Sequence, residues 1–226
     1  MSWLSRPILK FMVHVFDPSS SMPEANSTVL VIDDDPDLRA SVGRLLRSLG
    51  MNVQVFASIA DFLKADPPDT PTCLVLDVRL PGQSGLDFQR ELAAANKEIP
   101  IIFITGHGDI PMSVQAMKGG AIEFLTKPFR DQDLLDAIQL GLSRDRARRE
   151  NQKDLADLRE RFASLSPRER EIVIQVVRGR MSKQIAYDIG IAEATVKVHR
   201  SRAMQKLKAN SLPELGRMAD KLKLVP

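Results

Sequence analysis

Short apolar runs alternate with amphipathic stretches from Thr28 to about residue 143. Several of these runs are too uniformly apolar to leave one face in water, which is typical of strands in a parallel sheet that is covered on both faces. The runs that we interpret as strands are Thr28–Ile32, Asn52–Phe56, Cys73–Leu76, Ile101–Ile104 and Ile122–Leu125.

Between these runs, apolar residues recur at the spacing of an amphipathic helix. Strands that alternate with helices predict five βα units in series, and therefore a doubly wound α/β domain with a five-stranded parallel sheet. Ligands of such domains bind outside the carboxyl ends of the strands. The helical stripes are Leu38, Val42, Leu45, Leu46 and Leu49; Leu86, Phe88 and Leu92; Val114 and Met117; and Leu134, Leu135, Ile138 and Leu142.

The pattern changes after Leu142. A strongly charged stretch, 143–150, precedes a sparse apolar stripe at Leu155, Leu158 and Phe162, which we interpret as a helical linker whose charges are solvated and whose apolar residues could form a dimer seam. From Ser166 the pattern predicts short helices without strands. We therefore expect an N-terminal extension, disordered, at 1–27, an α/β domain at 28–143, a linker at 144–164 and a small all-α domain at 165–226.

The two halves of the chain carry opposite charge. Residues 1–143 contain twelve Lys and Arg against eighteen Asp and Glu, whereas residues 144–226 contain twenty against eleven. An acidic half suits a cation site and a basic half suits phosphate backbones, although a solvated basic surface is the simpler alternative.

Other features concern the environment of the protein. No run reaches the length of a membrane span, so we expect no membrane association. The lone Cys73 lies in an apolar run, where we expect it to be buried, and the lack of a partner cysteine favours a reducing cytoplasm. The apolar stretch in residues 1–27 is interrupted by Arg6 and Lys10. Translation could begin at Met22, or the stretch could be an amphipathic segment that binds a partner.

Polar residues follow four of the predicted strands, and the carboxyl ends of parallel strands meet at one edge of the sheet. An Asp triplet before proline is by itself more often a turn and a helix cap. Clustered carboxylates, however, repel one another unless a cation neutralises them, so the full set predicts a hard divalent metal with oxygen ligands, most naturally Mg²⁺. The residues are Asp33, Asp34 and Asp35; Asp77; Thr105; and Lys127.

The C-terminal helices have recognisable boundaries. Ser166 as N-cap, Pro167 at the first position and Glu169 predict a capping box, for a helix that continues to about Arg178. A second helix, capped by Ser182, is followed by a turn at Gly190 and a third helix from about Glu193 to Leu207. This arrangement predicts a helix-turn-helix.

Residues 29–142 resemble bacterial receiver domains. The resemblance depends on the stretch Val31–Asp34, on Asp77 in Leu76–Gly82, on Thr105 and on Lys127-Pro128-Phe129. The spacings are also those of the family: 43 positions from Asp34 to Asp77, 28 from Asp77 to Thr105 and 50 from Asp77 to Lys127. The segment Ile104–Met112 is similar to the FixJ branch in particular.

This resemblance implies a role for each residue of the acidic set. Asp77 would accept a phosphoryl group from a sensor histidine kinase, and Asp34, Asp77 and the backbone carbonyl of Arg79 would ligate Mg²⁺, with Asp33 acting through water. Lys127 would pair with the phosphate and precede a cis proline. Thr105 would turn toward the phosphoryl group. Phe124 would follow it as a switch aromatic, although ordinary core packing is an equal alternative. Gly82 and Gly85 are expected to serve backbone conformations that other residues avoid.

Residues 165–222 resemble the LuxR-type domain of NarL/FixJ regulators, notably at Lys183, Ile185-Ala186 and Thr195–Arg200. The chain departs from the family at Ser182, where Asn is usual, and at Ala192, which cannot cap the third helix at a cost of about 1 kcal/mol. We expect Val196, Ala203, Met204 and Leu207 to face the core. The expected DNA-binding residues are Thr195 and His199, with Lys197 and Arg200 reading bases and Lys183, Arg202 and Lys206 gripping phosphates.

Together these features predict a two-component response regulator that is not an enzyme. Phosphorylation of Asp77 would promote a homodimer, through the fourth helix and the fifth strand, that binds promoter DNA; RNA polymerase is a further candidate partner. One alternative is a constitutive DNA-binding protein with a non-signalling receiver. Another is a Mg²⁺-dependent phosphatase, which the basic helix-turn-helix and the position of Lys127 disfavour.

Overall fold

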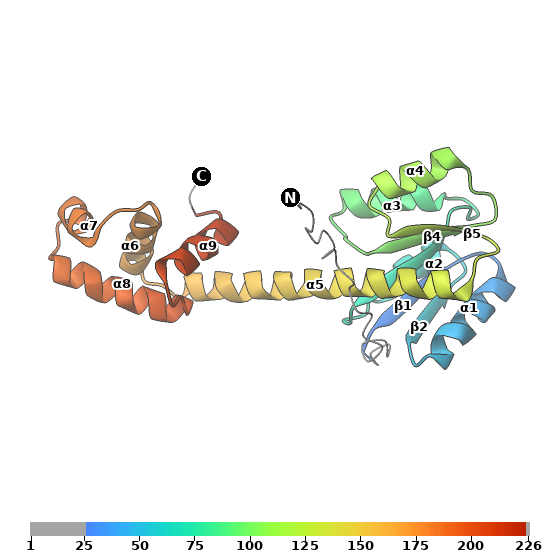
Figure 1. Cartoon of the computed structure of the whole chain (residues 1–226), viewed down its shortest axis with the longest axis horizontal. Coiled ribbons are helices and arrows are strands. Elements are labelled where there is room, and N and C mark those ends of the chain that lie inside the picture. Colours follow the sequence, from blue (N-terminus) through green and yellow to red (C-terminus); the bar gives the residue numbers. More distant parts are fainter. Residues whose placement is uncertain (1–25, 225–226) are drawn as a thin grey trace, which may run out of the picture. The chain divides into compact units, whose positions relative to one another are not determined.

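The structure is a computed structural model that describes residues 26–224 and contains two compact units, of which the first ends at Asp145 and the second begins at Arg146 (Figure 1). Nearly all of the expected extension at 1–27, with the alternative start at Met22, lies outside the described residues. No helix between residues 26 and 224 combines the length and apolarity needed to cross a bilayer.

The first unit contains one five-stranded sheet in which every neighbouring pair of strands is parallel, as predicted. The strand order is β2-β1-β3-β4-β5. Every residue of β1, β3 and β4 is buried, which explains their uniformly apolar sequences, whereas the two edge strands are partly exposed. The strands are β1 (Thr28–Ile32), β2 (Asn52–Phe56), β3 (Thr72–Asp77), β4 (Ile101–Thr105) and β5 (Glu123–Thr126).

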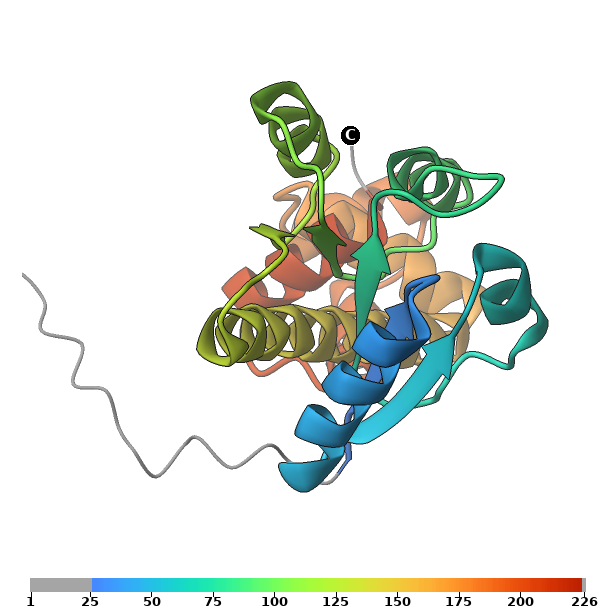
Figure 2. The ribbon, with the colours of Figure 1, turned by 90° about the vertical axis from the view of Figure 1, so that its right-hand side faces the viewer.

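Helices cover both faces of this sheet (Figure 2). Helices α1 (Pro36–Ser48) and α5 (Asp131–Ala163) supply Val42, Leu46, Leu134 and Ile138 to the core on one face. The core on the other face receives side chains from α2 (Ile59–Lys64), α3 (Gly85–Ala94) and α4 (Ile110–Lys118). The sheet is therefore doubly wound.

Two details of the helices differ from the sequence prediction. Helix α2 was not marked by an apolar stripe, because it has six residues and Ile59 is its only fully buried residue. On α4 the predicted stripe is wrong: Val114 and Met117 are each 45% exposed, and Ala116 is the residue that is fully buried. A small side chain at the contact lets α4 approach the sheet closely, while Met112 packs partly against the core and Val114 and Met117 stay exposed.

Helix α5 is continuous through the stretch that we interpreted as solvated charges. Asp145 is an exception to that interpretation, because its carboxylate is buried and accepts a hydrogen bond of 2.9 Å from the backbone N–H of Thr72 at the start of β3. Cys73, on the same strand, is buried as expected, and burial raises the pKa of its thiol. These residues bind α5 to the amino end of the sheet.

The second unit consists of helices α6 (Pro167–Val177), α7 (Ser182–Ile189), α8 (Glu193–Leu207) and α9 (Leu212–Leu222), with the end of α5. One apolar core joins them, and it includes Leu158 from α5 and Leu215 from α9. Helices α7 and α8 are separated by three residues, so the unit contains the predicted helix-turn-helix.

Candidate functional site

The predicted acidic set lies at the carboxyl edge of the sheet. Asp33 directly follows β1, Asp77 is the last residue of β3, Thr105 is the last of β4 and Lys127 directly follows β5. The backbone N–H of Lys127 donates to the carbonyl of Thr105 at 2.7 Å, which extends the pairing of β4 and β5 by one residue. The parallel register therefore brings together residues that are up to 94 positions apart.

The ammonium group of Lys127 lies between two carboxylates. Its Nζ is 2.5 Å from Asp77 Oδ2 and 2.7 Å from Asp33 Oδ2. The side chain of Asp33 is inaccessible and that of Asp77 is 7% exposed. Charges that are this shielded from water interact more strongly than surface pairs, so Lys127 is held firmly over Asp77. The Lys127–Pro128 peptide bond is cis, as predicted.

Burial and pairing act in opposite directions on these groups. Burial raises the pKa of Asp33 above its usual value, and this effect outweighs the hydrogen bond from Lys127. Burial acts to lower the pKa of Lys127, but its hydrogen bonds to Asp33 and Asp77 prevail and raise the pKa. Lys127 is therefore a stable cation within the pocket.

The pocket also fits a hard divalent cation. Carboxylate oxygens of Asp33, Asp34 and Asp77, one from each, all lie within 4.8 Å of one another. These are the oxygen ligands that Mg²⁺ prefers. Lys127 supplies one positive charge against these three carboxylates, which leaves room for further positive charge. Arg79, the fourth expected ligand, donates its backbone N–H to Asp77 Oδ1 at 2.8 Å and so lies at the rim of the pocket.

Thr105 and Phe124 lie on the neighbouring strands β4 and β5. Thr105 is buried, and its hydroxyl oxygen accepts a hydrogen bond of 3.3 Å from the backbone N–H of His107. The ring of Phe124 is partly buried and tilted against that of Phe103, with centroids 6.4 Å apart. A Cβ atom at Gly108 would lie 2.8 Å from Phe124, so the loop after β4 confines this ring. Sequence reasoning gave no role to Gly108.

The two glycines after Asp77 serve different purposes. Gly82 has a φ of 85°, as predicted for a turn that other residues avoid. The predicted reason is wrong for Gly85, which has no such φ. A Cβ atom there would lie 2.3 Å from the carbonyl oxygen of Asp77, so the start of α3 approaches the end of β3 too closely for any side chain. This glycine fixes the backbone at Asp77.

Sequence reasoning also missed Arg39. Its guanidinium donates a hydrogen bond of 2.5 Å to the backbone carbonyl of Asp33 and so connects α1 to the loop that presents Asp33 and Asp34. The position of Arg39 one turn into a helix that follows an Asp triplet is a signal that could have identified it.

In the second unit, the predicted capping box of α6 is confirmed. Ser166 Oγ accepts the N–H of Glu169, and the Glu169 carboxylate accepts the N–H of Ser166. The same carboxylate is buried and lies 2.7 Å from Lys206 Nζ on α8. The hydrogen bonds from Lys206 and Ser166 lower the pKa of Glu169. Lys206, which we expected to grip phosphate, is thus engaged within its own unit.

The start of α7 differs from the prediction. The N-cap is Met181, and Ser182 is the first residue of the helix, so the prediction of a Ser182 cap is wrong. The following turn is as predicted, with Gly190 in the left-handed conformation at the end of α7. Ala192 is the N-cap of α8 and forms no side-chain capping bond, as expected.

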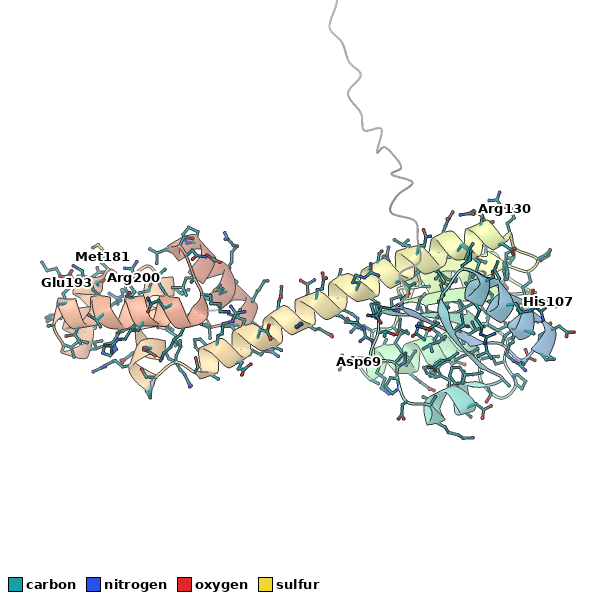
Figure 3. All side chains as sticks on the ribbon, turned by 90° about the horizontal axis from the view of Figure 1, so that it is seen from below. Asp69, His107, Arg130, Met181, Glu193 and Arg200 are labelled. Atoms are coloured by element: carbon teal, nitrogen blue, oxygen red, sulfur yellow. The ribbon has the colours of Figure 1, made fainter. Side chains whose placement is uncertain are left out.

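Helix α8 presents two distinct sides. Val196, Ala203 and Leu207 are buried in the core, and Met204 is partly buried against it. Thr195, Lys197 and Arg202 are exposed on α8, as is Lys183 on α7. Figure 3 labels Arg200 on this helix, with Glu193 at its first residue.

Two of the residues that we expect to contact DNA are less exposed to solvent than predicted. His199 and Arg200 are both partly buried. Among the residues that the structure describes, the buried Nδ1 of His199 has no hydrogen-bond partner, so this ring packs against the unit with one nitrogen inside. Val198, by contrast, is 48% exposed, and we had given it no role. Its position two residues after the buried Val196 is the signal that places it on the outer side of α8.

Comparison with known families agrees with this geometry. Residues 29–139 match the response regulator receiver domain, and residues 163–219 match the LuxR family of bacterial regulatory proteins. The two matches cover the sheet with its acidic edge and the helix-turn-helix, respectively.

Individual relatives match along most of their length. Nodulation protein W of Bradyrhizobium diazoefficiens is 54% identical over 86% of this chain and 86% of its own. The transcriptional regulatory protein FixJ of Azorhizobium caulinodans is 45% identical over 88% of this chain and 93% of its own. Among solved structures, the response regulator StyR has 49% identity and a TM-score of 0.77, over 87% of this chain and 99% of StyR. The chain therefore belongs to the FixJ branch of the NarL/FixJ response regulators, which join a receiver to a LuxR-type DNA-binding domain and regulate transcription rather than catalyse a metabolic reaction.

Proposed function

We propose that this regulator is switched by phosphorylation of Asp77 by a sensor histidine kinase, and that the phosphorylated form dimerises and binds promoter DNA. The observation that supports this proposal most strongly is the position of Asp77, a nearly inaccessible carboxylate whose oxygen lies 2.5 Å from Lys127 Nζ at an edge shared with Asp33 and Asp34. A cation fixed beside this carboxylate can stabilise the negative charge that a phosphoryl group brings to Asp77.

In the proposed reaction, a carboxylate oxygen of Asp77 attacks the phosphorus of a phosphohistidine on the kinase. A P–O bond forms and the P–N bond breaks, so the phosphoryl group becomes an acyl phosphate on Asp77 and the electron pair returns to the histidine ring. Lys127 binds the transferred oxygens as a point charge. Asp33, Asp34, Asp77 and the Arg79 carbonyl would hold Mg²⁺, which supplies positive charge against the transferred phosphoryl oxygens.

The response to phosphorylation involves the two strands beside the pocket. The hydroxyl of Thr105 turns toward the phosphoryl oxygens, and Phe124, confined between Phe103 and the Gly108 loop, moves into the space behind it. Phosphorylation favours this new arrangement to the extent that the new arrangement binds the phosphoryl group more tightly than the original arrangement does. Phe124 is thus proposed as the switch, rather than as simple core packing.

Dimerisation is proposed to use α4 and β5. Ile110 on α4 is 78% exposed, and Val114 and Met117 expose almost half of their surface. An exposed apolar helix face of this kind can pack against the same face of a second copy of the chain, related by a two-fold axis. A movement of Phe124 on β5 would alter this face directly.

The dimer is proposed to place α8 of each copy in the major groove, at half-sites about one helical turn apart. Lys197 and Thr195 lie on the exposed side of α8, and Lys183 and Arg202 are exposed beside them. Lys197 is the candidate for reading bases, and Lys183 and Arg202 are candidates for phosphate contacts. RNA polymerase is a further proposed partner at the promoter.

Binding assays on wild type and Asp77→Asn test this proposal. After incubation with acetyl phosphate and Mg²⁺, wild type should form dimers and bind its promoter more tightly, while the variant should change in neither respect. Equal and tight DNA binding by both proteins, with and without acetyl phosphate, would support constitutive binding with a non-signalling receiver. Release of phosphate from an unrelated ester at enzymatic rates would support the phosphatase alternative.

A further inference from the structure

A hollow of about 660 Å³ opens in the second unit beside α8. Its lining comes from the start of α7, one flank of α8 and the turn that follows α8. The lining includes Ser182, Lys197, Arg200, Ser201, Lys208 and Asn210.

The charge in this hollow is of one sign. Lys197, Arg200 and Lys208 contribute three cations, and none of the residues that line the hollow is acidic. Lys197 is paired with Glu193 at 2.8 Å, but both side chains of this pair are well exposed, so the pair neutralises little. Within residues 26–224, neither Arg200 nor Lys208 has an ion-pair partner. Unbalanced cations in a concave surface attract an anion.

The remaining lining groups are suited to phosphate oxygens. The hydroxyls of Ser182 and Ser201 and the carboxamide of Asn210 can donate hydrogen bonds from three different segments. Arg200 offers the planar pair of N–H groups that binds two oxygens of one phosphate. The volume is larger than a phosphate alone and leaves room for the adjoining sugar of a nucleic acid backbone.

The position of the hollow on α8 separates two groups of residues. Arg200 and Ser201 lie three and four residues after Lys197, on one flank of α8, and Lys208 is the C-cap residue after the helix. Val198 and Arg202 are exposed elsewhere on α8. Arg200, on this flank, is partly buried and lines the hollow. The first residues of a recognition helix contact base edges, so Lys197, near the start of α8, keeps its proposed role in reading bases. Arg200, farther along the same flank, and Lys208, just after the helix, face the wall of the groove, where the phosphates lie.

We propose that this hollow binds a backbone phosphate of DNA through Arg200 and Lys208, with Ser182 and Asn210 as additional donors. The proposal depends on the DNA binding described under the proposed function and refines it: Arg200 grips the backbone instead of reading a base, and the contact surface extends to the turn after α8.

Lys208 provides a test that spares the fold. Its φ is 57°, a conformation that glycine adopts without strain, so Lys208→Gly removes the charge and relieves the backbone. Lys223 ends α9 with a φ of 54° and does not line the hollow, so Lys223→Gly is a matched control. Arg200→Ala tests the second cation, with thermal unfolding to check its stability.

The full-length variants are phosphorylated with acetyl phosphate and titrated onto the promoter and onto a scrambled duplex at several salt concentrations. Lys208→Gly and Arg200→Ala should each weaken both duplexes by the same factor and flatten the slope of log affinity against log salt by about one unit, and Lys223→Gly should match wild type. Lys208→Gly that binds like Lys223→Gly would overturn the phosphate site. Loss of affinity by Arg200→Ala on the promoter alone would return Arg200 to base reading.

Two further outcomes remain distinct. Wild type that binds neither duplex would contradict the proposed function itself, before any variant is compared. A calorimetric titration with inorganic phosphate is expected to give only weak binding, because a free phosphate lacks the other contacts that DNA makes, and Lys208→Gly should weaken it further. Tight binding of inorganic phosphate by wild type, lost in Lys208→Gly while DNA affinity is unchanged, would make the hollow a site for a free anion and contradict the assignment to DNA.

Discussion

Lys127 Nζ lies 2.5 Å from Asp77 Oδ2 while it also contacts Asp33 at 2.7 Å, so one ammonium group joins the ends of three strands: β5, which precedes it, β3 and β1. A phosphoryl group on Asp77 would offer this cation more negative charge than the carboxylate does. The contact from Lys127 to Asp77 is therefore the point at which chemistry on one strand can be transmitted to another.

We predict that Lys127→Ala separates phosphorylation from output. Asp77 should still be labelled by acetyl phosphate, because its carboxylate remains, but no cation would draw β5 toward the phosphoryl group. Labelling and dimerisation are measured on the same samples, with Lys97→Ala as a control at an exposed lysine. A Lys127→Ala protein that dimerises on phosphorylation as wild type does would refute the coupling.

A second prediction concerns how α4 is attached to α3. The buried Gln89 donates to the carbonyl of Ala116 at 3.1 Å, and a Cβ atom at Gly119 would lie 2.5 Å from Gln89 Oε1. Gly119 has a φ of −74°, so alanine is not excluded by the backbone. Gly119→Ala should displace Gln89 and lower the free energy of unfolding by about 1 to 3 kcal/mol.

Gly216→Ala serves as the contrasting variant in that experiment. Gly216 lies inside α9 with no heavy atom near the position of a Cβ, so alanine should raise the free energy of unfolding by about 0.5 to 1 kcal/mol. Denaturant unfolding of both variants, followed separately for each unit, measures the two signs. An unchanged Gly119→Ala would mean that Gln89 does not hold α4.

Glu169 gives a prediction about pH. Its pKa is lowered in the folded state by Lys206 and Ser166, so the ionised side chain stabilises the second unit above the pKa of the unfolded chain, about 4.3. This contribution is lost as the pH falls through the lower, folded pKa. Glu169→Gln should therefore be less stable than wild type at pH 7, and the difference should shrink in acid.

Urea unfolding at several pH values between 3 and 7 measures this dependence, with Glu160→Gln as a control at an exposed position. A difference between wild type and Glu169→Gln that stays constant across that range would show that the charge of Glu169 does not stabilise the unit.

A fourth prediction separates two basic residues of α8 that appear equivalent in the sequence. Arg202 is exposed, whereas Lys206 is bonded to the buried Glu169. Arg202→Ala should reduce the salt dependence of DNA binding by about one unit without changing stability. Lys206→Ala should lower stability first, because it leaves a buried carboxylate unpaired. Thermal unfolding and DNA titration of both variants would reject this distinction if their effects were the same.

Much of the fold and the acidic pocket could be predicted because both depend on simple periodic patterns. Buried parallel strands need apolar runs, and residues at the ends of such strands must meet at one edge, which is why Asp33, Asp77 and Lys127 could be grouped across 94 positions. The cap of α6 could be predicted because Ser166 and Glu169 act within one helical turn.

The features that could not be predicted depend on how elements pack against one another, which the pattern of residues along the sequence does not show. Val114 and Met117 have the correct spacing for a buried stripe, but Ala116 is the residue of α4 that is fully buried. The pair Lys206 and Glu169 joins residues 37 positions apart on different helices. Gly85 is required by the carbonyl of Asp77, not by its own φ, and only the three-dimensional approach of α3 to β3 makes this visible.

Phosphorylation of Asp77 is tested most directly by identifying the residue that carries the phosphoryl group. Full-length wild type and Asp77→Asn are incubated with acetyl phosphate and Mg²⁺, and intact mass spectrometry measures the phosphoryl content of each protein. Asp77→Glu is included to separate loss of the carboxylate from a change in its position. We expect one phosphoryl group on wild type, sensitive to hydroxylamine as an acyl phosphate is, and none on Asp77→Asn, because an amide is a poor nucleophile. Full and stable labelling of Asp77→Asn would contradict this expectation.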